Sequence, residues 1–282
     1  MITPEFLEDL EGFSLIIRKR ITSKYSGSRV SLQSGRGIQI KEHRPYTRGD
    51  DIRTIDWKVY ARTDDLFVKI FEEDRDLSVH VIVDMTASME YGPKIRKIDY
   101  ASMLAAGFLF LAMRENERFR YAFMRENLEV HPLNRGRTHF ARFVNDANQA
   151  RPEGKMGIVD MVDAYKPLLT GKSMIIIISD FLFPADDVEY VLGNLRRHEV
   201  KLVRVLHPDE VSLPLEGDYL IIDAESRDEL RTHLSMRERA EYENRLREHS
   251  AQIEKACMRL GFDYHFANAN EPIFDAFFRM IS

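Results

Sequence analysis

The chain has 282 residues, of which 44% are apolar and 31% are charged, and its formal net charge is −5. This is the composition of an ordinary soluble globular protein, and the length allows one large or two small domains. The small net charge does not by itself indicate a partner. The single cysteine, Cys257, excludes an intrachain disulfide and a thiolate metal cluster.

The basic residues are concentrated near the N-terminus. Residues 18–62 hold twelve Lys and Arg against four Asp and Glu, a local charge of +8. Such a segment can form a surface for nucleic acid or for an acidic partner. The alternative is that the segment folds against the acidic remainder of its own chain.

The chain is expected to be cytoplasmic. Its first residues, MITPEFLEDLEG, are acidic and lack the pattern of a signal peptide. The longest apolar run, Met103 to Met113, is shorter than the roughly 20 residues that cross a bilayer.

Residues 1–75 predict a small basic subdomain that contains β-strands. A helix is expected from Glu5 to Ile21, where apolar residues recur at helical spacing, and an irregular loop over 23–37. Ile38 and Ile40 indicate a strand that ends near Pro45, and a second strand is expected over 66–71.

The most distinctive stretch is RPYTRGDDIRTIDWKVYAR, between these two strands. Its spaced residues are Arg44, Tyr46, Gly49, Asp50, Arg53, Asp56, Trp57 and Arg62. Arg beside Asp favours bidentate pairing, and Trp57 favours a buried aromatic centre, so we expect a polar and aromatic knot that ties the subdomain to the main sheet. Ile52 and Ile55 would face inward, and Trp57→Ala would cost about 3–5 kcal/mol. The alternative is a docking surface.

From residue 76 onward, strands and helices alternate. This pattern predicts a Rossmann-like domain over 76–282, with a mainly parallel, doubly wound sheet. Strands are expected at 78–84, 118–123, 128–131, 172–180, 201–206, 219–222 and 264–267, and helices at 94–114, 138–150, 158–165, 188–197, 235–261 and 273–281. His80 lies within the first of these strands and is expected to be a core histidine.

Oxygen-bearing side chains follow two of the buried strands. Asp84, Thr86 and Ser88 come directly after SVHVIV, and Asp180 follows MIIIIS. Ligands collect beyond the carboxyl ends of parallel strands, and hard oxygen ligands suit Mg²⁺, Mn²⁺ or Ca²⁺. The sequence therefore predicts that these four residues form a site at one edge of the sheet.

Two motifs resemble a known family. Asp84-Met85-Thr86-Ala87-Ser88 is similar to the Asp-x-Ser-x-Ser motif of the metal-ion-dependent adhesion site of von Willebrand factor A domains. The stretch from Arg44 to Arg62 resembles the signature of the bacterial domain of unknown function 58 family. Its members are von Willebrand factor A-like proteins usually associated with MoxR-type AAA+ ATPases. The resemblance covers roughly residues 25–225.

The resemblance implies a non-enzymatic protein-interaction module with an adhesion-like metal site. It would act with a MoxR-type AAA+ ATPase in the assembly, remodelling or activation of a client protein. Asp84, Thr86, Ser88 and Asp180 would hold Mg²⁺ or Mn²⁺, and a partner's carboxylate would complete the ion's oxygen shell.

The second loop of such a site departs from the family pattern. It normally supplies a threonine, whereas the aligned Gly154-Lys155-Met156-Gly157 places Met156 there. A thioether is a poor ligand for Mg²⁺, so a bound ion would be weak and exchangeable. The alternative is that Asp84 and Asp180 bond only to amides and hydroxyls. Asp84→Ala is expected to abolish partner binding without disrupting the fold.

Two other functions compete with the interaction module. One is a metal-dependent hydrolase that uses Asp84 and Asp180, although the sequence identifies no nucleophile, no phosphate-binding loop and no His-x-x-x-His pair. The other is a nucleic-acid-binding protein that uses the basic residues 18–62. Steep salt dependence of nucleic-acid binding would favour the latter.

Overall fold

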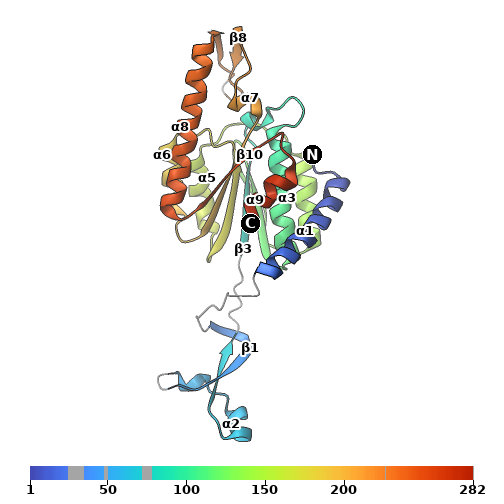
Figure 1. The fold of residues 1–282 in the computed structure, drawn as a ribbon, viewed down its shortest axis with the longest axis vertical. Coiled ribbons are helices and arrows are strands. Elements are labelled where there is room, and N and C mark those ends of the chain that lie inside the picture. The colour runs from blue at the N-terminus through green and yellow to red at the C-terminus, as the bar shows by residue number, and fades with distance from the viewer. Residues whose placement is uncertain (25–34, 48–49, 72–77, 226, 282) are drawn as a thin grey trace. The chain divides into compact units, whose positions relative to one another are not determined.

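The computed structural model describes residues 1–24, 35–47, 50–71, 78–225 and 227–281 (Figure 1). The chain forms two compact units, a large one of residues 1–16 and 77–282 and a small one of residues 17–76. The structure therefore moves the first residues of the chain out of the expected N-terminal subdomain of residues 1–75. The physical reason is that Ile2, Phe6 and Leu10 are buried in the core of the large unit.

A six-stranded sheet forms the centre of the large unit, in the order β10-β7-β6-β3-β4-β5. Its strands are β3 (Ser78–Asp84), β4 (Arg118–Met124), β5 (Leu128–Val130), β6 (Ser173–Ser179), β7 (Glu199–Leu206) and β10 (Asp263–Asn268). All neighbouring strands pair in parallel except β5, which is antiparallel to β4. The prediction of a mainly parallel sheet is confirmed.

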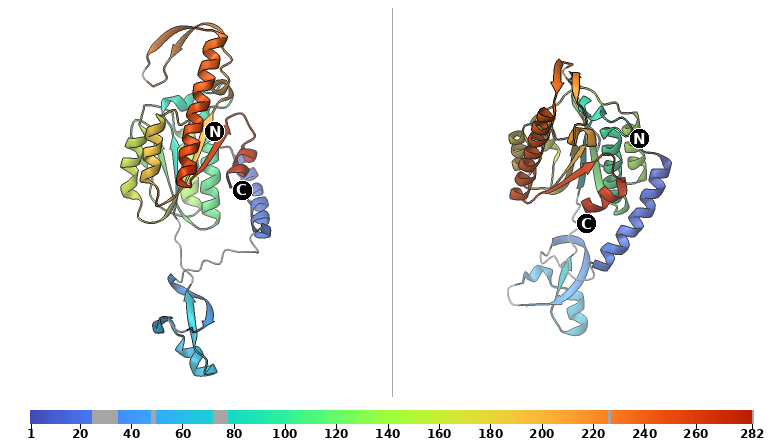
Figure 2. Two further views of the ribbon diagram at one scale, coloured as in Figure 1. Left: turned by 60° about the vertical axis from the view of Figure 1, so that its left-hand side comes forward. Right: turned by 45° about the horizontal axis from the view of Figure 1, so that its top comes forward.

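Helices cover both faces of this sheet, as the two views in Figure 2 show. One face carries the first part of α1 (Pro4–Lys24) with α3 (Lys97–Arg114), α4 (Arg137–Gln149) and α9 (Ile273–Ile281). The other carries α5 (Ile158–Tyr165), α6 (Ala185–Asn194) and α8 (Met236–Leu260). Successive side chains of a strand point to opposite faces, and β3 accordingly places Val81 in one hydrophobic core and Ile82 in the other.

His80 is a satisfied core histidine, as predicted. Its Nδ1 lies 2.7 Å from the Tyr165 hydroxyl, and its Nε2 lies 3.0 Å from the Ser78 hydroxyl. Burial, followed by the charge of Arg120, lowers the pKa of His80 to about 4. The ring is therefore neutral at pH 7 and serves the packing of β3 against α5.

A two-stranded hairpin leaves the carboxyl edge of the main sheet (Figure 1). It pairs β8 (Gly217–Ile222) with β9 (Glu229–Leu234), and it follows the short helix α7 (Pro208–Val211). The strand at 219–222 was predicted, but β9 was not. Helix α8 then begins with the expected capping box of Ser235 and Glu238, and it ends at the left-handed Gly261.

The small unit pairs β1 (Gly35–Pro45) with β2 (Phe67–Phe71) in antiparallel fashion, and it contains the 3₁₀ helix η1 (Ile52–Thr54) and the helix α2 (Trp57–Thr63). Its polar contacts match part of the expected knot. Arg44 Nη2 donates to Asp50 Oδ1 at 2.8 Å, and Asp56 caps α2 while contacting His43 at 2.8 Å. These contacts lie within the small unit.

The aromatic part of the expected knot is not formed within the small unit. Trp57 is 57% exposed, and among the described residues of this unit its aromatic neighbour is Tyr60, at 6.0 Å between ring centroids. Ile52 is also exposed, whereas Ile55 is buried as predicted. The reason is that none of the residues of α2 is buried within the small unit, so this helix has no covered face to receive the ring. A loss of 3–5 kcal/mol from Trp57→Ala is therefore no longer expected.

The remaining signature residues lie on or beside the helices of the small unit. Tyr46 follows β1, Arg53 belongs to η1, and Arg62 lies in the last turn of α2, where its Nε donates to the Lys58 carbonyl. Gly49 falls outside the described residues. In the parts of the chain that the structure describes, no helix is long and apolar enough to cross a bilayer.

Candidate functional site at the carboxyl edge of the sheet

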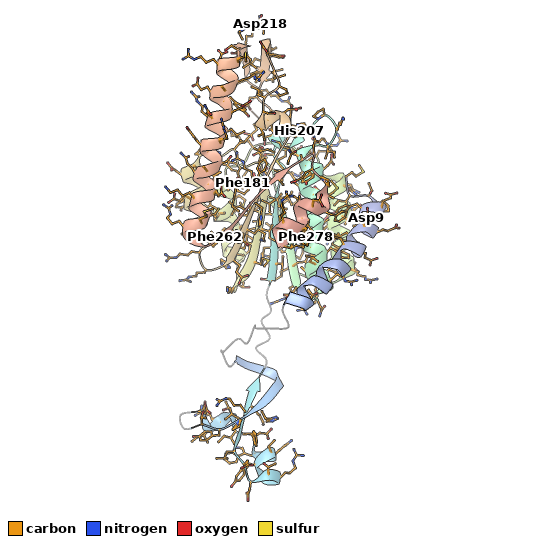
Figure 3. All side chains as sticks on the ribbon, in the orientation of Figure 1. Asp9, Phe181, His207, Asp218, Phe262 and Phe278 are labelled. Atoms are coloured by element: carbon orange, nitrogen blue, oxygen red, sulfur yellow. The ribbon has the colours of Figure 1, made fainter. Side chains whose placement is uncertain are left out.

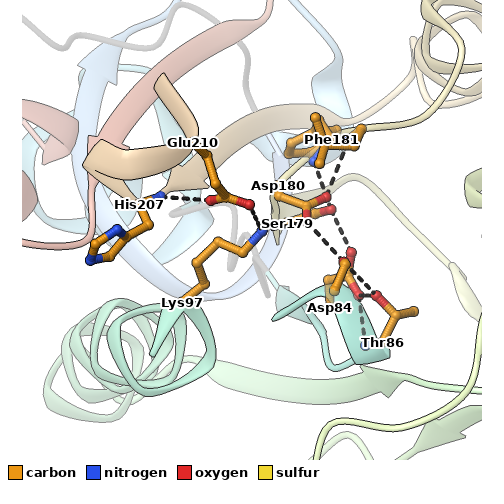
Figure 4. A network of polar contacts seen from close by, with 10 residues as sticks. Asp84, Thr86, Lys97, Ser179, Asp180, Phe181, His207 and Glu210 are labelled. Carbon is orange, nitrogen blue, oxygen red and sulfur yellow. Dashed lines mark hydrogen bonds and ion pairs between the residues drawn. The ribbon is translucent and has the colours of Figure 1, made fainter. Parts of the chain in front are cut away.

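The first and third loops of the expected site meet because β3 and β6 are adjacent. Val83 pairs with Ile178, so the two strands end side by side. Asp84 ends β3 and is followed by the 3₁₀ helix η2 (Ala87–Glu90), while Ser179 ends β6 and Asp180 follows it. Figure 4 shows these residues together, and in Figure 3 Phe181 and His207 mark the same edge on the whole molecule.

Asp84 is held by the protein on both of its carboxylate oxygens. Its Oδ1 accepts from the backbone N–H of Thr86 at 2.9 Å and from the Thr86 hydroxyl at 2.7 Å. Its Oδ2 accepts from the Ser179 hydroxyl at 2.6 Å. Burial, followed by the nearby charge of Asp180, raises the pKa of Asp84 to about 7.

These contacts indicate that Asp84→Ala would lower the stability of the fold, while the expectation that the fold stays intact remains a prediction. Asp84 is buried, and its removal would leave the donors of Thr86 and Ser179 without an acceptor. A buried donor left unsatisfied costs about 1–3 kcal/mol.

Ser88 and Asp180 complete the predicted set. The Ser88 hydroxyl donates to Asp180 Oδ2 at 2.9 Å and lies 3.3 Å from the Thr86 hydroxyl. The other oxygen of Asp180 accepts from the backbone N–H of Leu182 at 3.2 Å. All four residues expected from the sequence are thus brought into one hydrogen-bonded network.

The structure adds Lys97, which the sequence did not indicate. Its ammonium donates to Asp180 Oδ2 at 2.9 Å and to Glu210 Oε1 at 2.7 Å, and the side chain is 0% exposed (Figure 4). Glu210 accepts on its other oxygen from the backbone N–H of His207 at 2.8 Å. Burial alone would lower the pKa of Lys97, but the charges of Asp180 and Glu210 outweigh it and raise that pKa.

The second loop lies beside the first, as the alignment predicted. The backbone N–H of Ala87 donates to the Gly154 carbonyl at 3.1 Å. Lys155, however, pairs with Glu225 at 3.1 Å in the loop of the β8–β9 hairpin. Met156 is partly buried against the hydrophobic core that contains α5. The second loop therefore has no threonine at the aligned position, and the Met156 side chain that replaces it packs against this core.

These residues do not fit a tightly held Mg²⁺ or Mn²⁺ ion. The third-loop carboxylate, Asp180, already accepts from a buried ammonium, and the second loop supplies no hydroxyl. Within the described residues, no group of three or more His, Cys, Asp or Glu side chains is arranged to hold a metal. Bringing a divalent cation next to the Lys97 ammonium would also place like charges together in a poorly solvated site.

The structure describes the carboxylates on which the hydrolase would depend, but only part of the basic segment on which nucleic-acid binding would depend. Asp84 and Asp180 are both buried and bonded to donors of the protein, so neither carboxylate is presented to a substrate. The basic segment of residues 18–62 includes 25–34 and 48–49, which lie outside the described residues. The nucleic-acid hypothesis therefore stays a prediction.

Known proteins resemble this chain in sequence or in structure. An uncharacterized protein of Mycobacterium tuberculosis is 32% identical over 229 residues, which cover 79% of this chain and 72% of the relative. Among solved structures, the conserved hypothetical protein BatB of Bacteroides thetaiotaomicron has 13% identity and a TM-score of 0.45 over 73% of this chain and 97% of BatB. The VWA domain of SpRpn10 has 9% identity and a TM-score of 0.47 over 72% of this chain and 93% of that domain. The family model described as protein of unknown function DUF58 matches residues 42–252, and the chain belongs to this family.

Proposed function

We propose that the chain is a non-enzymatic protein-interaction module that binds its partner at the carboxyl edge of the large sheet. The partner would be a MoxR-type AAA+ ATPase, and the pair would assemble, remodel or activate a client protein. The observation that carries this proposal is that large apolar side chains are exposed at this edge, next to a polar network that is buried and hydrogen-bonded within itself.

Two of these exposed side chains belong to the loops of the site. Tyr91 follows η2 and is 46% exposed, and Leu182 follows Asp180 by two residues and is 51% exposed. The Tyr91 ring meets His207 edge-on at 5.4 Å between centroids, which helps to fix its position. Removing such apolar surface from water on binding is favourable, and tyrosine is enriched among the residues that dominate binding energy.

The hairpin exposes further apolar side chains, which lie on both of its faces. Leu220, Ile221, Ile222 and Leu230 are all exposed large hydrophobic residues of β8 and β9. The Lys155–Glu225 ion pair links the loop of this hairpin to the second loop of the site. Exposed large apolar side chains can mark a protein-interaction site.

The polar network supports a binding role over a hydrolytic one. Its carboxylates are engaged by Lys97, Ser88, Thr86 and Ser179. A satisfied buried network of this kind rigidifies the residues around it. Tyr91 and Leu182 are thereby carried on loops that are ordered before the partner arrives, which lowers the entropic cost of binding.

Leu182→Asp tests the proposal directly. The purified variant is expected to bind the MoxR-type ATPase of the same organism at least about tenfold more weakly than the unmodified chain, a loss of about 1.4 kcal/mol. Isothermal titration calorimetry would measure both affinities. The matched control is Met258→Asp, because Met258 is equally apolar and is exposed in the last turns of α8, away from this edge. Equal binding by Leu182→Asp and Met258→Asp would contradict the proposal.

A further inference from the structure

We propose that the Lys97 ammonium is the resident cation of the carboxyl-edge site, and that the site works without a divalent metal ion. The inference deepens the proposed function and rests on it only where partner binding is concerned. It starts from the contacts of three carboxylates, those of Asp84, Asp180 and Glu210.

Each of the six oxygens of these carboxylates already accepts a hydrogen bond from the protein. Asp84 is bonded by Thr86 and Ser179, and Asp180 by Leu182, Ser88 and Lys97. Glu210 is bonded by Lys97 and by the backbone of His207. In a metal site some of these oxygens would be directed at the ion, whereas here the position between Asp180 and Glu210 is filled by an ammonium.

The position of Lys97 in its helix is electrostatically unfavourable for a buried cation. It is the first residue of α3, where the exposed N–H groups and the helix dipole favour negative charge. A fully buried cation at that position is therefore opposed by its own helix. The two carboxylates that flank it supply the compensating charge, in the way that they would otherwise compensate a bound ion.

Lys97 also joins segments that are far apart in the sequence. It links the start of α3 to the end of β6 through Asp180, and to α7 through Glu210. Its backbone N–H donates to the Tyr91 carbonyl at 2.9 Å, at the end of the first loop. Lys97 thus contacts both loops: its ammonium bonds to Asp180, two residues before Leu182, and its backbone N–H bonds to Tyr91. Joining these loops is the structural role that a metal ion would have in an adhesion-like site.

The test compares metal binding by the unmodified chain and by Lys97→Met, each alone. Mn²⁺ is titrated into each protein, and the free ion is followed by electron paramagnetic resonance. The unmodified chain is expected to bind no Mn²⁺ at this site, and its melting temperature is expected to be the same in EDTA and in Mg²⁺. Lys97→Met keeps the apolar stem, frees the carboxylates, and is expected to show saturable Mn²⁺ binding that the unmodified chain lacks, with a melting temperature that rises in Mg²⁺.

The control is Lys172→Met, which removes a lysine from an exposed ion pair with Glu199 and is expected to gain no Mn²⁺ site. Stoichiometric Mn²⁺ binding by the unmodified chain, with loss of stability on chelation, would overturn the inference. So would a folded Lys97→Met that gains no affinity for Mn²⁺. If Lys97→Met does not fold, the titration of the unmodified chain still decides.

Measuring ATPase binding with and without a divalent metal ion separates a failure of this inference from a failure of the proposed function. Binding of the unmodified chain to the ATPase is expected to be the same in EDTA and in Mg²⁺, when ATP is left out. Binding that disappears in EDTA would overturn the inference and leave the interaction role standing. If the ATPase does not bind under either condition, the proposed function fails, while the Mn²⁺ titration continues to test the role of Lys97.

Discussion

Asp180→Ala is expected to lower the free energy of unfolding by about 3–5 kcal/mol, the usual cost of removing one partner from a buried ion pair. The Lys97 ammonium would keep only Glu210 as a charged partner, and the Ser88 hydroxyl would lose its acceptor. Both side chains of the Lys97–Asp180 pair are almost completely shielded from water. Urea denaturation followed by far-ultraviolet circular dichroism would measure the change.

The matched control is Glu199→Ala, which breaks the exposed Lys172–Glu199 pair. That pair has an N–O distance of 3.0 Å, nearly the same as the 2.9 Å of Lys97–Asp180, but its side chains are 60% and 52% exposed. Exposed ion pairs contribute about 0–1 kcal/mol. If Asp180→Ala costs no more than Glu199→Ala, Lys97 does not depend on Asp180 and the description of the network is wrong.

Phe277→Ala is expected to cost about 3–5 kcal/mol, because it removes a large aromatic side chain from the core. Phe277 of α9 is buried and meets Phe108 of α3 edge-on at 4.9 Å between centroids. The ring approaches α3 so closely that a Cβ added at Gly107 would lie 2.7 Å from it. The lost packing would loosen the attachment of α9 to α3, the helix whose first residue is Lys97.

Phe266→Ala is the control for this substitution. Phe266 lies on β10 and is 42% exposed, so its truncation removes much less buried area. Thermal unfolding of both variants, compared with the unmodified chain, would show whether the losses differ. Equal losses would mean that the contact between Phe277 and Gly107 does not contribute as the structure indicates.

Much of the large unit could be predicted from local patterns. The β-branched runs at 79–83 and 175–178 predict buried strands, and a parallel sheet places the ends of such strands at one edge. That reasoning was sufficient to bring together Asp84 and Asp180. The capping box at Ser235 likewise identified the start of α8, because a cap is set by residues adjacent in the sequence.

The cation of the site could not be predicted in this way. Lys97 contacts Asp180 and Glu210 across 83 and 113 residues, respectively. Glu210 is placed by α7, a helix of 4 residues with a capping box, whose sequence reads equally well as a turn. No spacing rule connects residues whose proximity depends on the whole sheet being assembled.

The sequence predictions that were wrong also have physical causes. Trp57 was expected to be buried because large aromatic residues usually are, yet none of the residues of α2 is buried within the small unit. The apolar stripe that contains Phe6 and Leu10 predicts a helix, but it does not specify which core receives it. Strand β9, ELRTHL, was missed because it is mostly polar and pairs only with β8.

The central claim is that the partner covers the carboxyl edge of the large sheet. Hydrogen–deuterium exchange of the chain, alone and in complex with the MoxR-type ATPase, measures this most directly. We predict slower exchange on binding at residues 85–92 and 181–184, which carry Tyr91 and Leu182. Protection confined to residues 166–172 and 194–198, at the opposite end of the strands, would contradict it.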